Sequence, residues 1–209
     1  LIDWDDYHGA AGAFVAHLLS TRLRKIFFAG GMTYQEWKPF GTNPFLLNLW
    51  SSEAVEFVGD GYEATRLQKI ARVARSDMAM DVLRVCWENP GGQYNCGRCE
   101  KCLRTMVGLR LAGALDRCTA FDGTLDVDAL ARRRYVFLNP VVRRCWTEIQ
   151  EELERRGDDP ELERAAHAFL TQNGATGRES EGALHARSRG AAWGWLRALI
   201  HARRTRDAE

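Results

Sequence analysis

The chain has 209 residues, of which 45% are hydrophobic and 27% charged, a globular composition with enough apolar material for a core. The 29 Lys and Arg residues nearly balance 28 Asp and Glu residues, so the net charge of +1 gives no bulk electrostatic case for nucleic acid or membrane. We find no secretory signal and no apolar run of bilayer length, and expect one domain with an appendage.

The first part of the chain predicts an α/β unit. Residues 7–19 combine small residues with Phe14, Val15 and Leu18, which is typical of a helix packed closely against a neighbour. Residues 25–31 then form a continuous apolar run ending in two glycines, as expected of a strand buried on both faces of a parallel sheet. A second short strand is predicted at 54–60, and the helix–strand order favours an α/β fold.

The loop after the first predicted strand is a candidate ligand site. Residues 32–45 include Thr33 and Tyr34 and follow the carboxyl end of that strand, where open α/β sheets bind their ligands. Within this loop, Asn43 and Pro44 predict the start of a short helix that runs through Trp50. We therefore expect substrate contacts from this loop.

A basic helix is predicted at residues 63–75. Four residues form its apolar face: Leu67, Ile70, Ala71 and Ala74. Its basic residues recur at every third position: Arg66, Lys69, Arg72 and Arg75. Such a stripe is typical of a solvated helix face. The alternative is that Arg66 and Lys69, in the first turns after a strand, bind phosphate or another anion.

Four cysteines between residues 86 and 102 have the spacing of a metal site. The pattern is C-x9-C-x2-C-x2-C, and the candidate ligands are Cys86, Cys96, Cys99 and Cys102. A C-x2-C pair can chelate one ion because the intervening turn brings both sulfurs to the same side. A strand at 82–87 is predicted to deliver the first ligand. The last ligand is expected at the start of a helix that runs to residue 115, where the helix dipole favours a thiolate.

The cysteine pattern is open to three interpretations. We favour a structural zinc ion held by four thiolates, because a polar, Gly- and Pro-rich loop is untypical of a core. An iron–sulfur cluster, and ordinary thiols or disulfides, are the alternatives. Clustered thiols indicate a reducing compartment, so we expect a cytoplasmic location. The other two cysteines, Cys118 and Cys145, are expected to be buried packing residues.

The rest of the chain predicts helices. They span residues 127–138, residues 140–157 and residues 159–174, with Asp126 as a cap and Gly157 as a stop. We divide the chain into an α/β domain with the metal site (1–118), a helical appendage (119–172), a linker (173–189) and a basic amphipathic tail helix (190–209). That tail helix suits docking on a membrane or on a partner, and the alternatives are packing on its own domain or disorder.

With these elements in place, the chain resembles the C-terminal part of PP-loop (N-type) ATP pyrophosphatases, in particular 7-cyano-7-deazaguanine synthases and their uncharacterised relatives. The first set of residues that carry the resemblance is Cys86, Cys96-Gly97-Arg98-Cys99 and Cys102-Leu103-Arg104. The second is the strand ending Phe28-Ala29-Gly30-Gly31 and the run from Thr65 to Ile70. The likeness covers about residues 9–113.

The resemblance implies a fold and an activity. The fold would be a partial Rossmann-like parallel sheet of the adenine nucleotide alpha hydrolase type, with a four-cysteine metal loop and a C-terminal all-helical appendage. The activity would be an amide- or nitrile-forming synthase that adenylates a carboxylate with ATP and Mg²⁺, and the Zn²⁺ would be structural. Partners would be a small-molecule substrate or nucleotide, and a homo-oligomer is compatible with the sequence. No residue is singled out as catalytic.

One family feature has no counterpart in this chain. No stretch matches the S-G-G-x-D-S loop whose backbone N–H groups hold pyrophosphate in the family. We therefore expect that an N-terminal portion is absent or that the chain is a degenerate relative. In either case we expect no ATP chemistry from this chain alone.

Two other hypotheses come from different functional classes. The first is a non-catalytic zinc module that contacts a protein partner or RNA. Its phosphate contacts would be basic residues near the metal loop: Arg66, Lys69, Arg98, Lys101 and Arg104. The balanced net charge counts against this module. The second is an iron–sulfur-dependent tRNA-modifying relative, which would carry a coloured cluster.

Overall fold

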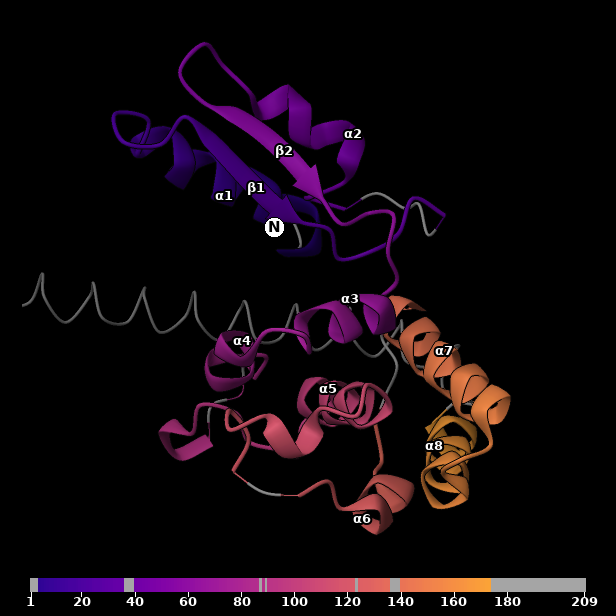
Figure 1. Cartoon of the computed structure of the whole chain (residues 1–209). Coiled ribbons are helices and arrows are strands. Elements are labelled where there is room, and N and C mark those ends of the chain that lie inside the picture. The colour runs from indigo at the N-terminus through magenta and orange to yellow at the C-terminus, as the bar shows by residue number, and fades with distance from the viewer. Residues whose placement is uncertain are drawn as a thin grey trace, which may run out of the picture. The chain divides into compact units, whose positions relative to one another are not determined.

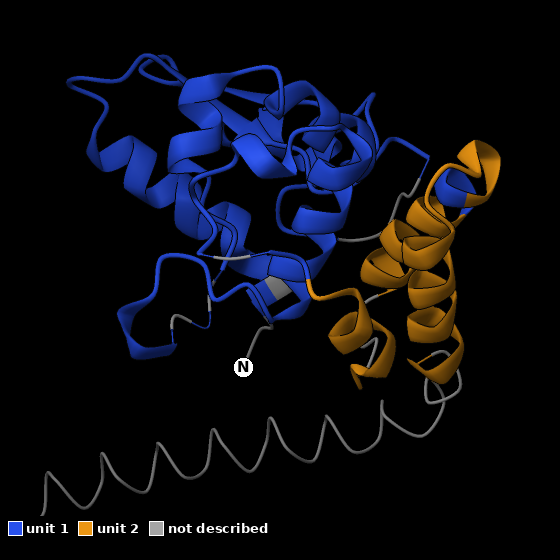
Figure 2. Ribbon diagram, turned by 60° about the horizontal axis from the view of Figure 1, so that its bottom comes forward, with its two compact units in different colours: residues 1–125, 151–153 blue, residues 126–150, 154–209 orange. Residues whose placement is uncertain are grey.

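The computed structural model describes residues 4–35, 40–86, 88, 90–122, 124–135 and 140–173. They form a mixed α/β protein that is mostly helical (Figure 1). The chain divides into two compact units, residues 1–125 with 151–153 and residues 126–150 with 154–209 (Figure 2). The predicted tail helix lies outside the described residues, as does the predicted linker beyond residue 173. None of the helices in the described part of the chain has the length and apolar character that a bilayer crossing requires.

Two parallel strands form the sheet of the first unit. Strand β1 (Lys25–Ala29) pairs with β2 (Glu56–Asp60) in a register that sets Lys25 opposite Glu56 and Ala29 opposite Asp60. An ion pair between Lys25 Nζ and Glu56 Oε2, 2.9 Å apart, joins the two strands where they begin. The two strands and their parallel pairing confirm the prediction from the sequence.

Helix α1 (Trp4–Leu18) packs on one face of this sheet. The contact is an apolar cluster of small helix residues and larger sheet residues: Ala13, Ala16, Ile26, Phe28, Val55 and Phe57. Gly12 permits the close approach, because a Cβ at this position would lie 2.7 Å from the ring of Phe28. Phe27 lies on the other face and is 64% exposed. The predicted burial of β1 on both faces is therefore wrong, because only one face is covered by described residues.

Caps in the sequence fix the helices that flank β2. Asn43 accepts a hydrogen bond from Phe45 N at 2.9 Å and precedes α2 (Pro44–Leu47), which continues into the 3-10 helix η1 (Asn48–Trp50). After β2, Thr65 and Gln68 form a reciprocal capping box that begins α3 (Arg66–Val73). Both helices were predicted from the sequence.

The strand predicted at residues 82–87 is wrong. Helix α4 (Asp77–Val82) occupies the start of that segment, capped by the hydroxyl of Ser76, which accepts from Ala79 N. Residues 83–86 that follow belong to no strand. The physical reason is that the backbone N–H groups of Val85 and Cys86 donate to the side chain of Asn95 instead of to a neighbouring strand.

Helix α5 (Glu100–Leu111) is the most buried helix of the first unit, and it begins at the metal loop as predicted. A short 3-10 turn, η2 (Pro90–Gly92), lies within that loop, and another, η3 (Leu115–Arg117), follows the helix. The helix ends four residues before the predicted end at residue 115. Gly113 adopts a φ of +64°, and Ala114 N turns back to donate to Leu109 O at 2.8 Å.

The described part of the second unit contains helices α6 (Val127–Arg132), α8 (Pro160–Asn173) and α7 (Pro140–Arg156) apart from its residues 151–153. Asp126 caps α6, and Gly157 follows α7 with a φ of +64°, both as predicted. Helix α6 ends at Arg132, earlier than predicted, because Asn173 binds the backbone of Arg133 and Tyr135. The predicted helical character of this region is confirmed.

Candidate metal centre

The four cysteines predicted as ligands meet at one point. Their Sγ atoms all lie within 4.8 Å of one another. The Cys86–Cys99 and Cys96–Cys102 sulfur pairs are each 3.9 Å apart. A zinc ion about 2.3 Å from each of four thiolates sets neighbouring sulfurs about 3.8 Å apart in a tetrahedron. The observed spacing therefore fits one tetrahedral ion, and the cluster is compatible with a structural Zn²⁺ site.

The sulfur spacing also bears on the two alternatives. None of the six cysteines forms a disulfide, and separations of 3.9 Å are nearly twice the disulfide bond length of about 2.05 Å. A four-iron cluster binds each thiolate on a separate iron atom, which requires sulfurs farther apart than the 4.8 Å limit here. The geometry favours a single ion.

Three of the ligands come from one compact turn. Gly97 has a φ of +67°, which lets the chain reverse between Cys96 and Cys99. The backbone N–H of Cys99 points at Cys96 Sγ, 3.3 Å away, and Cys99 is also the N-cap of α5. Cys102 lies in the first turn of that helix, where backbone N–H groups and the helix dipole favour a thiolate. This arrangement was predicted from the spacing.

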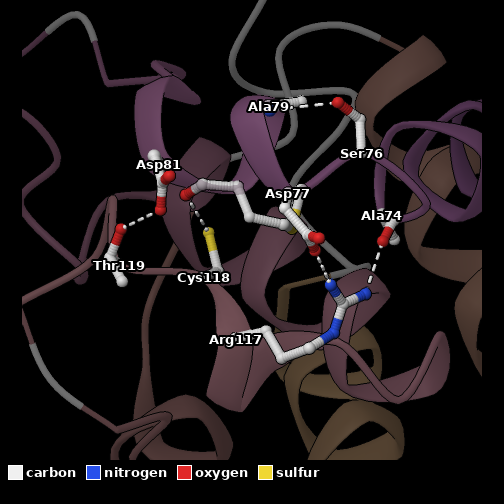
Figure 3. Close-up of polar contacts among 9 residues, drawn as sticks. Ala74, Ser76, Asp77, Ala79, Asp81, Arg117, Cys118 and Thr119 are labelled. Atoms are coloured by element: carbon white, nitrogen blue, oxygen red, sulfur yellow. Dashed lines mark hydrogen bonds and ion pairs between the residues drawn. The ribbon is translucent and has the colours of Figure 1, made fainter.

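The fourth ligand, Cys86, follows helix α4, and residues 117–119, at and after the end of η3, hold that helix in place (Figure 3). Arg117 forms an ion pair with Asp77 and donates to Ala74 O at 2.6 Å. Thr119 Oγ1 lies 2.7 Å from an oxygen of Asp81. Between them, the buried thiol of Cys118 donates to Met80 O at 3.3 Å, so the prediction that Cys118 is a packing residue is confirmed.

Burial controls the protonation of the ligands when no ion is bound. Burial raises the pKa of the Cys99 thiol to about 11, although the backbone N–H of Cys102 offsets part of the effect. The pKa of Cys102 is raised well above its usual range, again mainly by burial. Both thiols are therefore protonated at neutral pH without an ion. A bound cation would convert them to thiolates and release protons.

An ion pair in the first turns of α5 lies beside the ligands. Arg104 Nε is 3.1 Å from Glu100 Oε1, and the two side chains are only 11% and 4% exposed. Arg104 is therefore engaged within the protein and is a poor candidate for an RNA contact. Arg98 and Lys101, the other basic residues predicted near the loop, are exposed.

The residues predicted to bind substrate or phosphate gather at the carboxyl end of β1. Lys69 Nζ donates to Gly30 O at 2.8 Å, and Arg66 donates to Gly31 O at 3.3 Å. Thr33 and Tyr34 belong to the same loop, and Tyr34 N donates to Tyr62 O at 3.0 Å. Arg72 and Arg75 are exposed, as expected of a solvated helix face. Residues 36–39 of this loop lie outside the described residues.

Two residues that position these sites were missed by sequence reasoning. The side chain of Asn95 forms hydrogen bonds with backbone groups of residues 83–86, before the metal loop, and of Ala120, after it. The hydroxyl of buried Tyr62 donates to Thr42 O. An Asn next to a ligand in a polar loop and a Tyr after a strand are both common. Neither had a sequence signal beyond its proximity to a predicted site.

The described residues thus form a mixed α/β fold with a two-stranded parallel sheet, and four of their cysteines converge in a geometry compatible with Zn²⁺. A pair of basic side chains at the carboxyl end of β1 is a separate feature. Comparisons with protein-family models, with curated proteins and with solved structures found no match for this chain.

Proposed function

We propose that Cys86, Cys96, Cys99 and Cys102 bind one Zn²⁺ ion as a structural centre. The convergence of all four sulfurs within 4.8 Å carries this proposal, because nine residues separate Cys86 from the compact turn. Four thiolates leave no open coordination position, so the ion would join segments rather than activate water. It would tie the chain after α4 to the first turn of α5.

Metal analysis of the purified full chain tests this centre. We expect one zinc per chain, and we expect Co²⁺ in its place to give the absorption of a tetrahedral four-thiolate site. Cys102→Ser is the test variant and Cys118→Ser its matched control, because both thiols are buried and only one belongs to the cluster. Equal metal content in these two variants, or a brown iron-containing protein, would contradict the proposal.

We further infer that the chain is the C-terminal portion of a carboxylate-activating enzyme similar to PP-loop ATP pyrophosphatases. The cysteine motif supports this inference, and so do the two parallel strands. Lys69 and Arg66 of α3 donate to the backbone that follows the carboxyl end of β1. Ligands of open α/β sheets bind at that end, and two cations suit a phosphate or carboxylate. Thr33 and Tyr34 would contribute to the same ligand site.

The chemistry of such an enzyme divides into two steps. A substrate carboxylate would attack the α-phosphorus of ATP and release pyrophosphate, and a nucleophile would then displace AMP from the acyl adenylate. Mg²⁺, if bound, would supply neutralisation of the phosphate charge. In that scheme Lys69 and Arg66 bind and orient an anionic group of the ligand. The phosphate loop would have to come from polypeptide outside this sequence, because the sequence has no S-G-G-x-D-S match.

The reading frame upstream of Leu1 offers the first test, since it should encode S-G-G-x-D-S after an apolar strand. A polypeptide that contains both parts should exchange pyrophosphate into ATP in the presence of its carboxylate substrate. Lys69→Met should abolish most of this exchange, whereas Arg72→Met, an exposed cation of the same helix, should not. A salt-sensitive complex of the present chain with RNA, without exchange by the longer polypeptide, would favour the binding module instead.

A further inference from the structure

Asn95, the residue immediately before the ligand Cys96, is 2% exposed and uses its whole carboxamide. Its Oδ1 accepts hydrogen bonds from Val85 N at 3.0 Å and from Cys86 N at 3.1 Å. Its Nδ2 donates to Leu83 O at 2.7 Å and to Ala120 O at 2.8 Å. All the N–H groups and lone pairs of the carboxamide are therefore in use.

No close substitute can make this set of contacts. A carboxamide presents two donors and two acceptor sites, and the backbone here offers two N–H groups to one end and two carbonyls to the other. Aspartate supplies the oxygen but lacks the donors, and alanine supplies neither. The contacts thus require Asn at this position and fix the amide orientation.

The second observation concerns the loop between Cys86 and Cys96. Gly91 and Gly92 have φ values of +64° and +80°, and a Cβ built on either would meet nothing within 4 Å. Packing at these two glycines therefore does not fix the distance between Cys86 and Cys96. The compact turn that holds the other three ligands has its own support in Gly97 and the Cys99 N–H to Cys96 Sγ contact.

We propose that Asn95 is the positioning residue that brings Cys86 to the metal as its fourth ligand. It binds the backbone N–H of Cys86 directly, and through Ala120 O it binds the segment that also holds α4. The inference rests on the proposed zinc centre. Its consequence is specific: without the Oδ1 acceptor of Asn95, which binds Cys86 N, the site keeps three thiolates and loses the fourth.

The Co²⁺ spectrum of the full chain distinguishes this role from a merely structural one. In Asn95→Ala we expect the thiolate-to-cobalt charge-transfer intensity to fall by about a quarter, because three thiolates of four remain. We also expect zinc transfer to a chelator to become about 10- to 100-fold more favourable, the usual effect of losing an outer-shell partner. Cys86→Ser should give the same spectrum, and adding Asn95→Ala to Cys86→Ser should change it no further.

Asn173 provides the matched control. It is 4% exposed, and its carboxamide also accepts from one backbone N–H and donates to two backbone carbonyls, in the second unit. Asn173→Ala should lower thermal stability but leave the cobalt spectrum at four thiolates. If Asn95→Ala behaves like Asn173→Ala, the positioning role is overturned and the zinc centre stands. If the wild-type chain gives no four-thiolate spectrum, the zinc centre itself is overturned.

A second pair of variants covers a failure of Asn95→Ala to fold. Asn95→Asp keeps an oxygen that accepts from Val85 N and Cys86 N, so it should retain the four-thiolate spectrum. Asn95→Ser is too short to reach both groups and should give the three-thiolate spectrum. Identical spectra from these two variants would contradict the proposal.

Discussion

Ile70 of α3 lies so close to Gly108 of α5 that a Cβ at position 108 would come within 2.7 Å of Ile70 Cδ1 and 3.1 Å of Cγ2. Both residues are buried, and the contact joins the helix that follows the sheet to the helix that begins at the metal loop. The glycine is therefore a packing requirement inside a helix, where its intrinsic propensity is unfavourable.

Gly108→Ala should destabilise the protein. The gain in helix propensity is about 1 kcal/mol, whereas overpacking in a buried contact costs about 1–3 kcal/mol, so we expect a net loss of free energy of unfolding. Denaturant unfolding measures it. Adding Ile70→Val removes the nearest methyl group and should recover part of the loss. Additive effects of the two substitutions would show that the residues do not compete for the same space.

Tyr62→Phe should cost about 1–3 kcal/mol of stability. Its hydroxyl donates to Thr42 O in a buried environment, and burial also raises the pKa of Tyr62, so removing the hydroxyl leaves a buried carbonyl without this donor. Tyr94→Phe is the control, because the Tyr94 hydroxyl also donates to a backbone carbonyl, that of Val82, but is exposed. Water can replace the lost contact there, so thermal unfolding should barely change. Equal losses for the two variants would contradict the role of burial.

Arg104→Met should destabilise the protein by about 3 kcal/mol, because it leaves the carboxylate of Glu100 buried without its cation. Arg132→Met removes the same kind of (i, i+4) pair, with Asp128, at a site where the side chains are 72% and 80% exposed. It should cost less than about 0.5 kcal/mol. Chemical denaturation measures the free energy of unfolding of both variants. A larger loss of stability in Arg132→Met than in Arg104→Met would contradict the role of burial.

The apparent affinity for zinc should fall as pH falls. The raised pKa values of Cys99 and Cys102 mean that protons must leave before the ion binds. Competition with a chelator between about pH 6 and pH 8 should show a weakening of at least about tenfold per pH unit. An affinity independent of pH would show that the thiols are already ionised.

The stability of the metal-free chain should fall as pH rises into the alkaline range. Because the pKa of Cys99 rises from 9.0 to about 11 on folding, its contribution to stability is complete below the unfolded value. This stabilising contribution of Cys99 is lost as pH rises through its pKa of about 11 in the folded state. Denaturation of the metal-free chain should therefore become easier in that alkaline range, and bound zinc should suppress the effect because the thiolates are then paired with the ion.

Local patterns in the sequence were sufficient for the two strands, the set of candidate ligands and several helices, but not for α4. Caps such as Thr65 and Asp126 act within a single turn, and the C-x2-C spacing brings two sulfurs together through one local reversal. These features depend on neighbours along the chain, so they can be found without knowing the fold.

Contacts between distant segments decided the rest. The segment at 83–86 is not a strand because the side chain of Asn95 takes its backbone hydrogen bonds, and β1 has an open face that its continuous apolar run concealed. The sequence placed four thiols within reach of one ion. Only the tertiary structure set Cys86 beside the other three, because that distance depends on hydrogen bonds among residues 83–86, 95 and 120, which no periodicity encodes.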